Sequence, residues 1–157
     1  MFVTDKAFNP MQFALLQAEI AGKNGEIPVG AVIFDAKENK IVASAGNRVE
    51  ETKNPLNHAE ILVINEACRK LGSKTLDNLD IYVTLEPCPL CASAISLVRL
   101  KRLYFGAYDP KSGGVLHGPK IFQSSSCHHI PEIYSGIEEM KCSEIIRNFF
   151  TEIRMIK

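Results

Sequence analysis

The sequence lacks an apolar segment long enough to cross a bilayer. Its longest run without charged or strongly polar residues extends from Ile27 to Phe34, whereas a membrane-spanning helix needs about 20 such residues. The first residues, from Met1 to Lys6, also lack the basic start, the apolar stretch and the cleavage site of a secretory signal. We therefore expect a cytoplasmic protein that does not enter a membrane.

The sequence also lacks an excess of charge of either sign. Its 18 basic residues are balanced by 18 acidic ones, so the overall field of the protein does not attract nucleic acid. Any polyanion must therefore meet a local basic patch. One candidate is the segment from Arg99 to Lys120, which contains five basic residues and a single acidic one, Asp109. A solvent-exposed face is the simpler interpretation of such a segment.

A disulfide framework is a third feature that we expect to be absent. The five cysteines are odd in number and follow no export signal, which favours free thiols and metal ligands over disulfide bonds. The sequence also has no internal repeat, linker or low-complexity tract. With 157 residues, of which 46% are hydrophobic and 23% charged, the chain fits a single globular domain, residues 1–157.

The hydrophobic pattern predicts strands that alternate with helices. We expect helices at residues 8–23, 58–71, 92–100 and 137–156, strands at 27–35, 41–45, 81–86, 103–107 and 131–134, and polar loops at 48–57 and 109–118. Two of the strands are almost wholly apolar, which is typical of strands covered on both sides. The predicted fold is therefore α/β: a three-layer α/β/α sandwich in which helices cover both faces of a mixed five-stranded sheet.

Two short motifs place reactive side chains at the starts of helices. His58-Ala59-Glu60 opens the second predicted helix, and Pro87-Cys88-Pro89-Leu90-Cys91 precedes the third. Helix starts on the same edge of a sheet converge, so the two motifs can meet in space. Cys88 and Cys91 are three residues apart and share one face of a helical turn, where the helix N-terminus lowers the pKa of thiols.

These residues indicate one Zn²⁺ ion per chain. His58, Cys88 and Cys91 supply three of the four ligands of a tetrahedral site, and an open fourth position is typical of catalytic rather than structural zinc. Water bound at such a position loses its proton near pH ~7. Glu60 lies two residues beyond His58 and points in another direction, so we expect it to be the catalytic acid and base that moves protons between this water and the substrate.

A structural zinc site with a fourth protein ligand is the alternative interpretation. The remaining cysteines and histidines are the candidates for that ligand: Cys68, Cys127, Cys142, His117, His128 and His129. Cys68 lies ten residues along the same predicted helix from His58, roughly 15 Å away, which is too far for one ion. A Cys-x-x-Cys pair alone leaves structural and redox roles open, whereas its combination with His-x-Glu favours catalysis.

The two motifs stand within longer strings that resemble one enzyme family. The strings are E-I-P-V-G-A-V at 26–32, G-N-R at 46–48, N-H-A-E-I at 57–61, Y-V-T-L-E-P-C-P-L-C at 82–91, F-G-A-Y-D-P-K-S-G at 105–113 and F-F at 149–150. Together they resemble the bacterial tRNA-specific adenosine deaminases, within the zinc-dependent cytidine and deoxycytidylate deaminase superfamily. The resemblance implies a cytidine deaminase-like fold and the hydrolytic deamination of adenosine to inosine at the wobble position of a tRNA anticodon.

The resemblance also implies roles for residues outside the zinc motifs. Asn47 would hydrogen-bond the flipped nucleotide, the Ala59 N–H would contact its base edge, Pro28 and Val29 would wall the pocket, and Asp109 would lie beside the RNA strand. The residues by themselves allow plainer roles. Asn47 can cap a turn, Pro28 can be an edge-strand proline, and Asp109 can begin a Pro-containing turn.

Two kinds of partner follow from the same resemblance, a tRNA anticodon stem-loop and a second copy of the chain in a homodimer. Apolar residues of the last predicted helix are one candidate surface for the dimer: Ile137, Ile145, Phe149 and Ile153. The helical spacing of these residues is equally explained by packing in the core.

Three positions depart from the family pattern because they lack basic residues: Tyr108, Ile130 and Thr151. Phosphate contacts supply much of the affinity for nucleic acid, so a second hypothesis stays open, a deaminase of free nucleobases, nucleosides or nucleotides. Tyr108 can instead stack on an unpaired base. A third hypothesis is a zinc-stabilised binding module without catalysis, in which Glu60→Gln would change nothing measurable.

Overall fold

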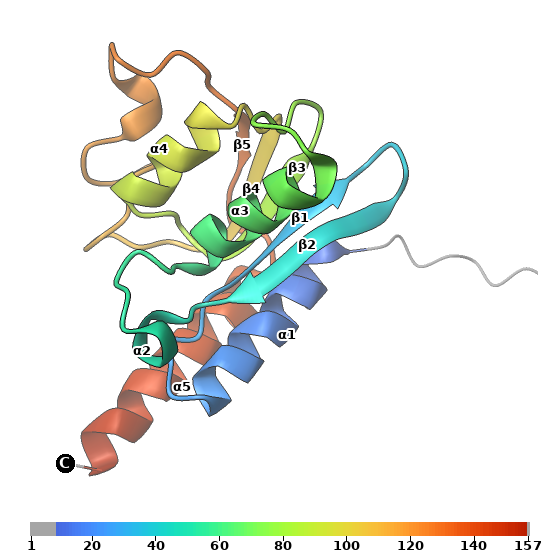
Figure 1. The fold of residues 1–157 in the computed structure, drawn as a ribbon. Coiled ribbons are helices and arrows are strands. Elements are labelled where there is room, and N and C mark those ends of the chain that lie inside the picture. Colours follow the sequence, from blue (N-terminus) through green and yellow to red (C-terminus); the bar gives the residue numbers. More distant parts are fainter. Residues whose placement is uncertain (1–8, 157) are drawn as a thin grey trace, which may run out of the picture.

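The central sheet places three parallel strands beside an antiparallel hairpin (Figure 1). The computed structural model describes residues 9–156, so Phe8, where the first predicted helix begins, and Met1–Lys6 lie outside the described residues. The strands are β1 (Gly30–Asp35), β2 (Lys40–Gly46), β3 (Asp80–Leu85), β4 (Arg102–Ala107) and β5 (Glu132–Tyr134). Their order is β2-β1-β3-β4-β5, with β1 antiparallel to both neighbours, which confirms the predicted mixed five-stranded sheet.

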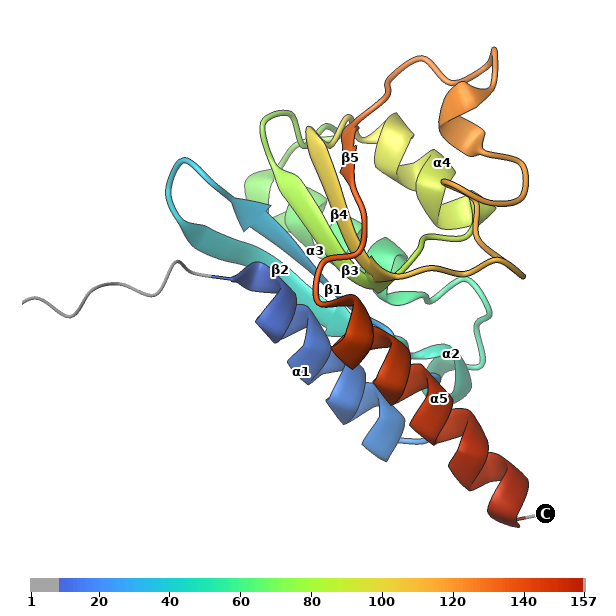
Figure 2. The same ribbon diagram turned by 180° about the vertical axis from the view of Figure 1, so that it is seen from behind.

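Helices cover both faces of this sheet (Figures 1 and 2). α1 (Pro10–Lys23) and α5 (Glu139–Ile156) lie side by side on one face, and α3 (Ala59–Leu71) and α4 (Pro89–Leu97) lie on the other. The predicted three-layer α/β/α sandwich is therefore confirmed. Within residues 9–156, no helix is both long enough and apolar enough to span a bilayer.

Alternate side chains of the strands enter two separate cores, as the two-residue period of a strand requires. Val32 of β1 packs with Met11 of α1 and Cys142 of α5 on one side of the sheet. Its neighbours Ala31 and Ile33 belong to the larger core on the side of α3 and α4. Burial on both sides explains why the sequence of β1 is continuously apolar rather than alternating.

Two glycines allow α1 to lie directly on the sheet. A Cβ atom at Gly30 would overlap the carbonyl oxygen of Ala14, and one at Gly46 would lie 2.6 Å from the carbonyl oxygen of Gln17. Only a residue without a side chain permits this approach. The close packing fixes the chain segment that precedes β1, which forms part of the site described below.

Element boundaries differ from the predicted ones at the starts of three helices. α3 begins at Ala59, and His58 is its N-cap rather than a residue of its first turn. α4 spans Pro89–Leu97 rather than residues 92–100, because Pro89 takes the first helical position. α5 begins after Glu138, whose φ of 55° is left-handed, and not at residue 137.

Two short helices interrupt segments without a predicted element. They are α2 (Val49–Thr52), inside the predicted polar loop 48–57, and the 3-10 helix η1 (Ile121–Gln123). α2 is held by a carboxylate distant in the sequence, since the two oxygens of buried Glu26 accept hydrogen bonds of 2.9 Å from the N–H groups of Glu50 and Glu51. A contact of this kind leaves no trace in the local hydrophobic pattern.

Candidate active site

Two helix N-termini bring three potential metal ligands to one point. His58 is the N-cap of α3, Cys88 is the N-cap of α4, and Cys91 lies in the first turn of α4. The Sγ atoms of Cys88 and Cys91 lie 3.6 and 3.4 Å from Nδ1 of His58. All three ligand atoms are within 4.8 Å of one another. The structure thus brings together the residues that the two sequence motifs single out.

The spacing of these atoms fits a tetrahedral zinc ion. Zinc bonds of about 2.3 Å to sulfur and about 2.0–2.1 Å to nitrogen, at tetrahedral angles, place the sulfur and nitrogen atoms about 3.6 Å apart. The observed separations of 3.4 and 3.6 Å agree with this value. No other cysteine, histidine or carboxylate of residues 9–156 joins the group, so the described part of the chain offers no fourth protein ligand. A three-ligand set is the one found in catalytic zinc sites.

The electrostatics of the cluster favour a bound cation. A hydrogen bond from the Cys91 thiol, aided by the nearby His58, lowers the pKa of Cys88, and the same hydrogen bond raises the pKa of Cys91. The contact between Cys88 and the His58 ring raises the pKa of the His58 imidazole. Cys88 is therefore the thiol of the pair that loses its proton more readily, and thiolates are the form of cysteine that binds metal.

Glu60 lies beside this cluster in the first turn of α3. The residue is only 4% exposed, and this burial raises the pKa of its carboxyl group. Its side chain does not belong to the ligand group, yet it lines the same cavity as His58 and Cys88. A buried carboxyl group beside a metal site, free of coordination, is suited to transfer protons.

A cavity of about 520 Å³ opens next to the ligands, which lies in the range of small-molecule pockets, roughly 300–1,000 Å³. It is bounded by the segment before β1, the loop after β2, the start of α3, the ends of β3 and β4, and one side of α5. The candidate site residues that line it are Val29, Asn47, His58, Glu60, Cys88 and Asp109. Pro28, Ala59 and Cys91 are not part of its lining.

The chain is similar to known deaminases. A family model described as MafB19-like deaminase matches residues 5–154. The tRNA-specific adenosine deaminase of Rickettsia bellii is 52% identical over 144 residues, which cover 92% of this chain and 99% of that protein. The one of Agrobacterium fabrum is 47% identical over 145 residues, which cover 92% of this chain and 94% of that protein. This chain belongs to the tRNA-specific adenosine deaminase family.

The fold of this deaminase family is also seen in a solved structure. That structure comes from studies of A-to-I editing by tRNA:A34 deaminases at the wobble position of transfer RNA, and it matches with a TM-score of 0.83 at 47% identity. The match covers 86% of this chain and 96% of the other. The family resemblance inferred from the sequence strings and the cytidine deaminase-like fold that it implied are both confirmed.

Asn47 ties three segments of this deaminase together at the edge of the cavity. Its Oδ1 accepts a hydrogen bond of 2.8 Å from the Ala59 N–H, and its Nδ2 donates one of 3.2 Å to the Ile27 carbonyl. The Ala59 N–H is therefore already engaged by Asn47. Pro28 is buried beside Gly22 of α1 and not in the cavity wall, because the chain turns it towards the helix.

Asp109 begins a turn at the mouth of the cavity. Its Oδ1 accepts hydrogen bonds from the N–H groups of Lys111 and Ser112, so the turn role considered for this residue is observed. The neighbouring Tyr108 also lines the cavity, and its hydroxyl group donates to Oγ of Ser135 at 2.9 Å. Tyr108 is 37% exposed, so one part of the ring is open to solvent.

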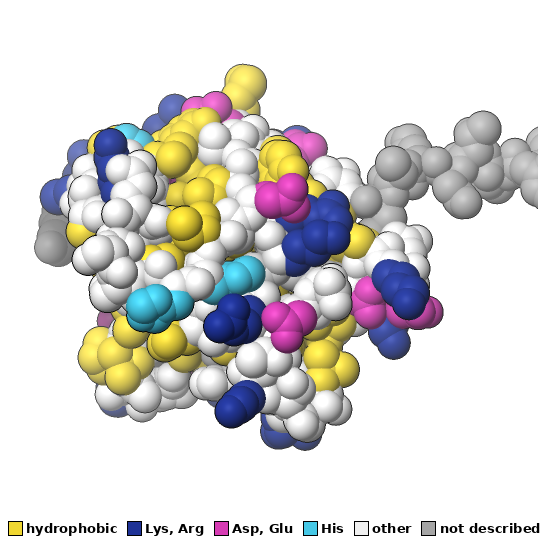
Figure 3. All heavy atoms as spheres, turned by 90° about the horizontal axis from the view of Figure 1, so that it is seen from above, with side chains coloured by type: hydrophobic (Ala, Val, Ile, Leu, Met, Phe, Trp, Pro, Cys, Tyr) yellow, Lys and Arg dark blue, Asp and Glu magenta, His cyan; other side chains and the backbone are white. Residues whose placement is uncertain are grey.

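The basic residues between 99 and 120 do not gather into one patch around the cavity. Only Lys111 of this set lines it. Arg102 lies at the other end of its strand, 3.5 Å from both Asp80 and Glu132. Figure 3 shows one face of the molecule, on which basic side chains are interspersed with acidic, apolar and uncharged ones. Four of its basic side chains, Arg99, Lys101, Lys111 and Lys120, are exposed, which fits the simpler interpretation, whereas most of β4 within the segment is buried.

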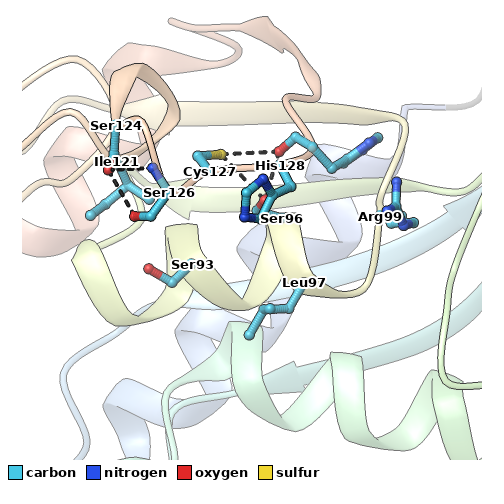
Figure 4. Close-up of a pocket in the computed structure, with 10 residues that line it drawn as sticks. Ser93, Ser96, Leu97, Arg99, Ile121, Ser124, Ser126, Cys127 and His128 are labelled. Atoms are coloured by element: carbon cyan, nitrogen blue, oxygen red, sulfur yellow. Dashed lines mark hydrogen bonds between the residues drawn. The ribbon is translucent and has the colours of Figure 1, made fainter.

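A second cavity, of about 330 Å³, lies between α4 and the segment 121–129 (Figure 4). Its inward polar groups bond to one another: Oγ of Ser96 donates to the carbonyl of His129 at 2.6 Å and contacts Sγ of Cys127 at 3.3 Å. None of its lining residues belongs to the metal cluster or lines the first cavity. This cavity is therefore separate from the site of this deaminase.

Several residues of the cavity were missed by the sequence reasoning as candidate site residues: Ile27, Leu85, Glu86, Lys111, Ser112, Ile146 and Phe150. Ile146 and Phe150 are four residues apart on α5 and so share one face of that helix. The F-F string at 149–150 was the signal that pointed to them. Glu86 stands directly before Pro87-Cys88, and an acidic residue at the end of an apolar strand was the signal available there.

Proposed function

We propose that this protein is a zinc-dependent hydrolase that converts adenosine to inosine at the wobble position of a tRNA anticodon. One observation carries this proposal: the ligand atoms of His58, Cys88 and Cys91 have the spacing of a three-ligand zinc site beside a buried carboxyl group, in a chain 52% identical to a tRNA-specific adenosine deaminase. The three residues hold the ion, with one ion per chain.

Glu60 performs the proton transfers of the proposed reaction. An ion held by His58, Cys88 and Cys91 would lower the pKa of water and so make it a nucleophile for hydrolysis. Glu60 would accept one proton of the attacking water and pass it to a ring nitrogen of adenine. It would then move the second proton of that water, from the hydroxyl group now on the ring carbon, to the amino group, which leaves as ammonia. The net reaction consumes one water, releases one ammonia and leaves inosine.

The cavity suits a base that has been removed from a stack. Ile27, Val29 and Phe150 give it apolar walls that exclude water around a flat ring. The nucleotides of an anticodon loop are unpaired, so one base can be splayed into the cavity while the stem remains outside. Lys111 at the cavity supplies a cation for the RNA backbone, and the ring of Tyr108 offers a face on which a neighbouring base can stack.

The substrate contacts implied by the family are part of this proposal. Asn47 and Val29 line the cavity, as does Asp109, whose Oδ1 also holds a turn. Ala59 and Pro28 act through their neighbours. The Ala59 N–H orients the Asn47 amide through its hydrogen bond, and buried Pro28 packs beside Gly22 and so positions Val29, the next residue. The nucleotide then contacts the side-chain amide of Asn47, whose Oδ1 can accept a second hydrogen bond and whose Nδ2 has a second N–H to donate.

A deaminase of free nucleobases, nucleosides or nucleotides is the second candidate. It is favoured by one observation, that Lys111 is the sole Lys or Arg lining the cavity among residues 9–156. Phosphate contacts normally supply much of the affinity for RNA, so a weakly basic site suits a small substrate better than it suits RNA. A single assay separates the two candidates, since they differ in substrate and share the zinc chemistry.

We also propose that the protein forms a homodimer through the outer face of α4. Leu90 and Leu97 are seven residues apart on one face of this helix, and their side chains are 43% and 78% exposed. Ile137 and Ile145 of the candidate α5 surface pack against the core instead. Sedimentation should show a dimer that Leu97→Glu converts to a monomer, whereas a wild-type monomer at micromolar concentration would contradict this interface.

We further propose that residues 1–157 act as one deaminase domain in the cytoplasm. The family model matches residues 5–154, and the relatives are covered over 94% and 99% of their length. The five cysteines are all unpaired, as expected in a reducing compartment where thiolate ligands remain available for zinc.

The proposed function is tested with an anticodon stem-loop that carries adenosine at the wobble position. Inosine should form in this RNA, and a control stem-loop with its adenosine at another loop position should remain unchanged. Free adenosine, cytidine and guanine are assayed in parallel with the same zinc-loaded sample. Reaction of the small substrates alone would support the second candidate and reject the first.

A further inference from the structure

Glu86 is a buried acidic residue at the point where β3 leads into the metal site. It directly follows β3 and is separated from the ligand Cys88 by Pro87. Its side chain is 0% exposed, and its sole ion-pair partner within residues 9–156 is His117, whose Nδ1 lies 2.7 Å from Oε1. A buried carboxylate in this position needs a full set of hydrogen bonds to be stable.

One loop supplies the hydrogen bonds to this carboxylate. Oε1 accepts a bond of 3.2 Å from the N–H of Asp109, and Oε2 accepts bonds of 3.2, 3.0 and 3.1 Å from the N–H groups of Val115, Leu116 and His117. Both ends of the segment 109–117 are therefore fastened to one side chain. We call this segment the 109–117 loop.

The loop also lies directly against the chain that carries Cys88. A Cβ atom at Gly113 would overlap Oε2 of Glu86, and one at Gly114 would lie 2.6 Å from the backbone nitrogen of Pro89. The N–H of Gly114 donates to the carbonyl of Pro87 at 2.8 Å. These contacts leave no space between the loop and the start of α4.

The 109–117 loop forms one wall of the cavity. Its residues Asp109, Lys111 and Ser112 line the same space as His58 and Glu60. A loop rich in glycine loses much conformational entropy when it is ordered, so it needs a strong anchor to keep this shape. Charge-assisted hydrogen bonds to a buried carboxylate provide such an anchor.

The groups around Glu86 agree with this role. Four backbone N–H groups of the loop and Nδ1 of His117 lie within 3.2 Å of its two carboxyl oxygens. A carboxylate accepts hydrogen bonds only, so every donor of the loop meets an acceptor.

We propose that Glu86 is a positioning residue that holds the 109–117 loop as a wall of the substrate cavity and thereby sets the affinity for RNA. It acts through the loop and takes no part in the proton transfers. The inference rests on the proposed function, because the loop wall meets a nucleotide of RNA only if RNA is the substrate.

The test compares Glu86→Gln with Asp80→Asn. Glu86→Gln keeps the shape of the side chain but turns one acceptor into an NH₂ group that faces backbone donors. Asp80 is a matched control, because it is a buried carboxylate at the opposite end of β3. Zinc content, kcat and KM for the stem-loop, and amide hydrogen exchange are measured for both variants and for the wild type.

For Glu86→Gln we expect wild-type zinc content, a kcat within about threefold of wild type and a KM raised about 10- to 100-fold. Amides of residues 115–117 should exchange faster. Asp80→Asn should leave KM and the exchange of the loop unchanged, even where it lowers stability. A general loss of stability would not separate KM from kcat in this way. An unchanged KM, a fall in kcat alone or a loss of zinc in Glu86→Gln would overturn the proposal.

Gly113→Ala tests the same contact from the side of the loop. The added methyl group would overlap Oε2 of Glu86 and would also lie 2.5 Å from the carbonyl oxygen of Asp109, so it disturbs the packing between the carboxylate and the loop without removing the carboxylate. This variant decides the question if Glu86→Gln does not fold. It should reproduce the rise in KM, and the effect of the double variant should be smaller than the sum of the two single effects, because both variants disturb the contact between Glu86 and the loop. If wild-type protein forms no inosine in the stem-loop, the proposed function fails, while hydrogen exchange still decides whether Glu86 holds the loop.

Discussion

Replacing Glu60 by Gln should stop proton transfer while leaving the metal ligands in place. Glu60 is 4% exposed and lies in the first turn of α3, two residues from His58, so the amide fits the same space. A general acid–base group contributes about 10²–10⁴-fold to a rate, which corresponds to about 3–5 kcal/mol of the barrier. The single-turnover rate of inosine formation in a stem-loop should fall by this factor. Zinc content should remain that of the wild type.

The control for this variant is Glu66→Gln on the same helix. Glu66 lies on the exposed side of α3 in a surface pair with Arg69, a kind of contact that contributes little to stability. Its replacement should leave the rate and the zinc content unchanged. A Glu60→Gln variant that retains zinc and loses less than tenfold in rate would show that the carboxyl group does not carry the proton.

Three other contacts give further predictions. Cys91→Ala removes one of three ligands, so elemental analysis should show loss of zinc and the assay no inosine; a variant that keeps its zinc would disprove the ligand role. Gly30→Ala forces a methyl group onto the Ala14 carbonyl and should lower the free energy of unfolding by about 1–3 kcal/mol in urea denaturation; an unchanged midpoint contradicts this packing. Asn47→Ala leaves the buried Ala59 N–H unpaired and should cost about 1–3 kcal/mol by the same measurement; wild-type stability would mean that the bond contributes nothing.

The metal site could be predicted from the sequence because the residues within each of its two motifs are close together along the chain. His58 and Glu60 are two residues apart and Cys88 and Cys91 are three apart, so each pair is fixed by a single turn of chain. The period of apolar residues likewise predicted the strands and the helices, and hence the layers. Only the proximity of the two motifs in space depends on tertiary structure, and it was predicted because helix starts on the same edge of a sheet converge.

The rest of the site depends on contacts between distant segments. Asn47 joins Ile27 to Ala59, and Glu86 fastens a loop that begins 23 residues further along the chain. Hydrogen bonds of this kind leave no periodic signal, so the sequence pattern shows neither. Pro28 was expected in the pocket wall and is turned towards α1, because the approach of that helix is decided by the absence of a side chain at Gly22 and Gly30.

The most direct test of the whole account is to incubate zinc-loaded protein with a transfer RNA whose anticodon begins with adenosine and to sequence the product. We predict inosine at that nucleotide, in an amount that rises with time and depends on the metal. A transfer RNA that keeps its adenosine, in the presence of protein that carries one zinc ion per chain and hydrolyses a free nucleobase, would contradict the account.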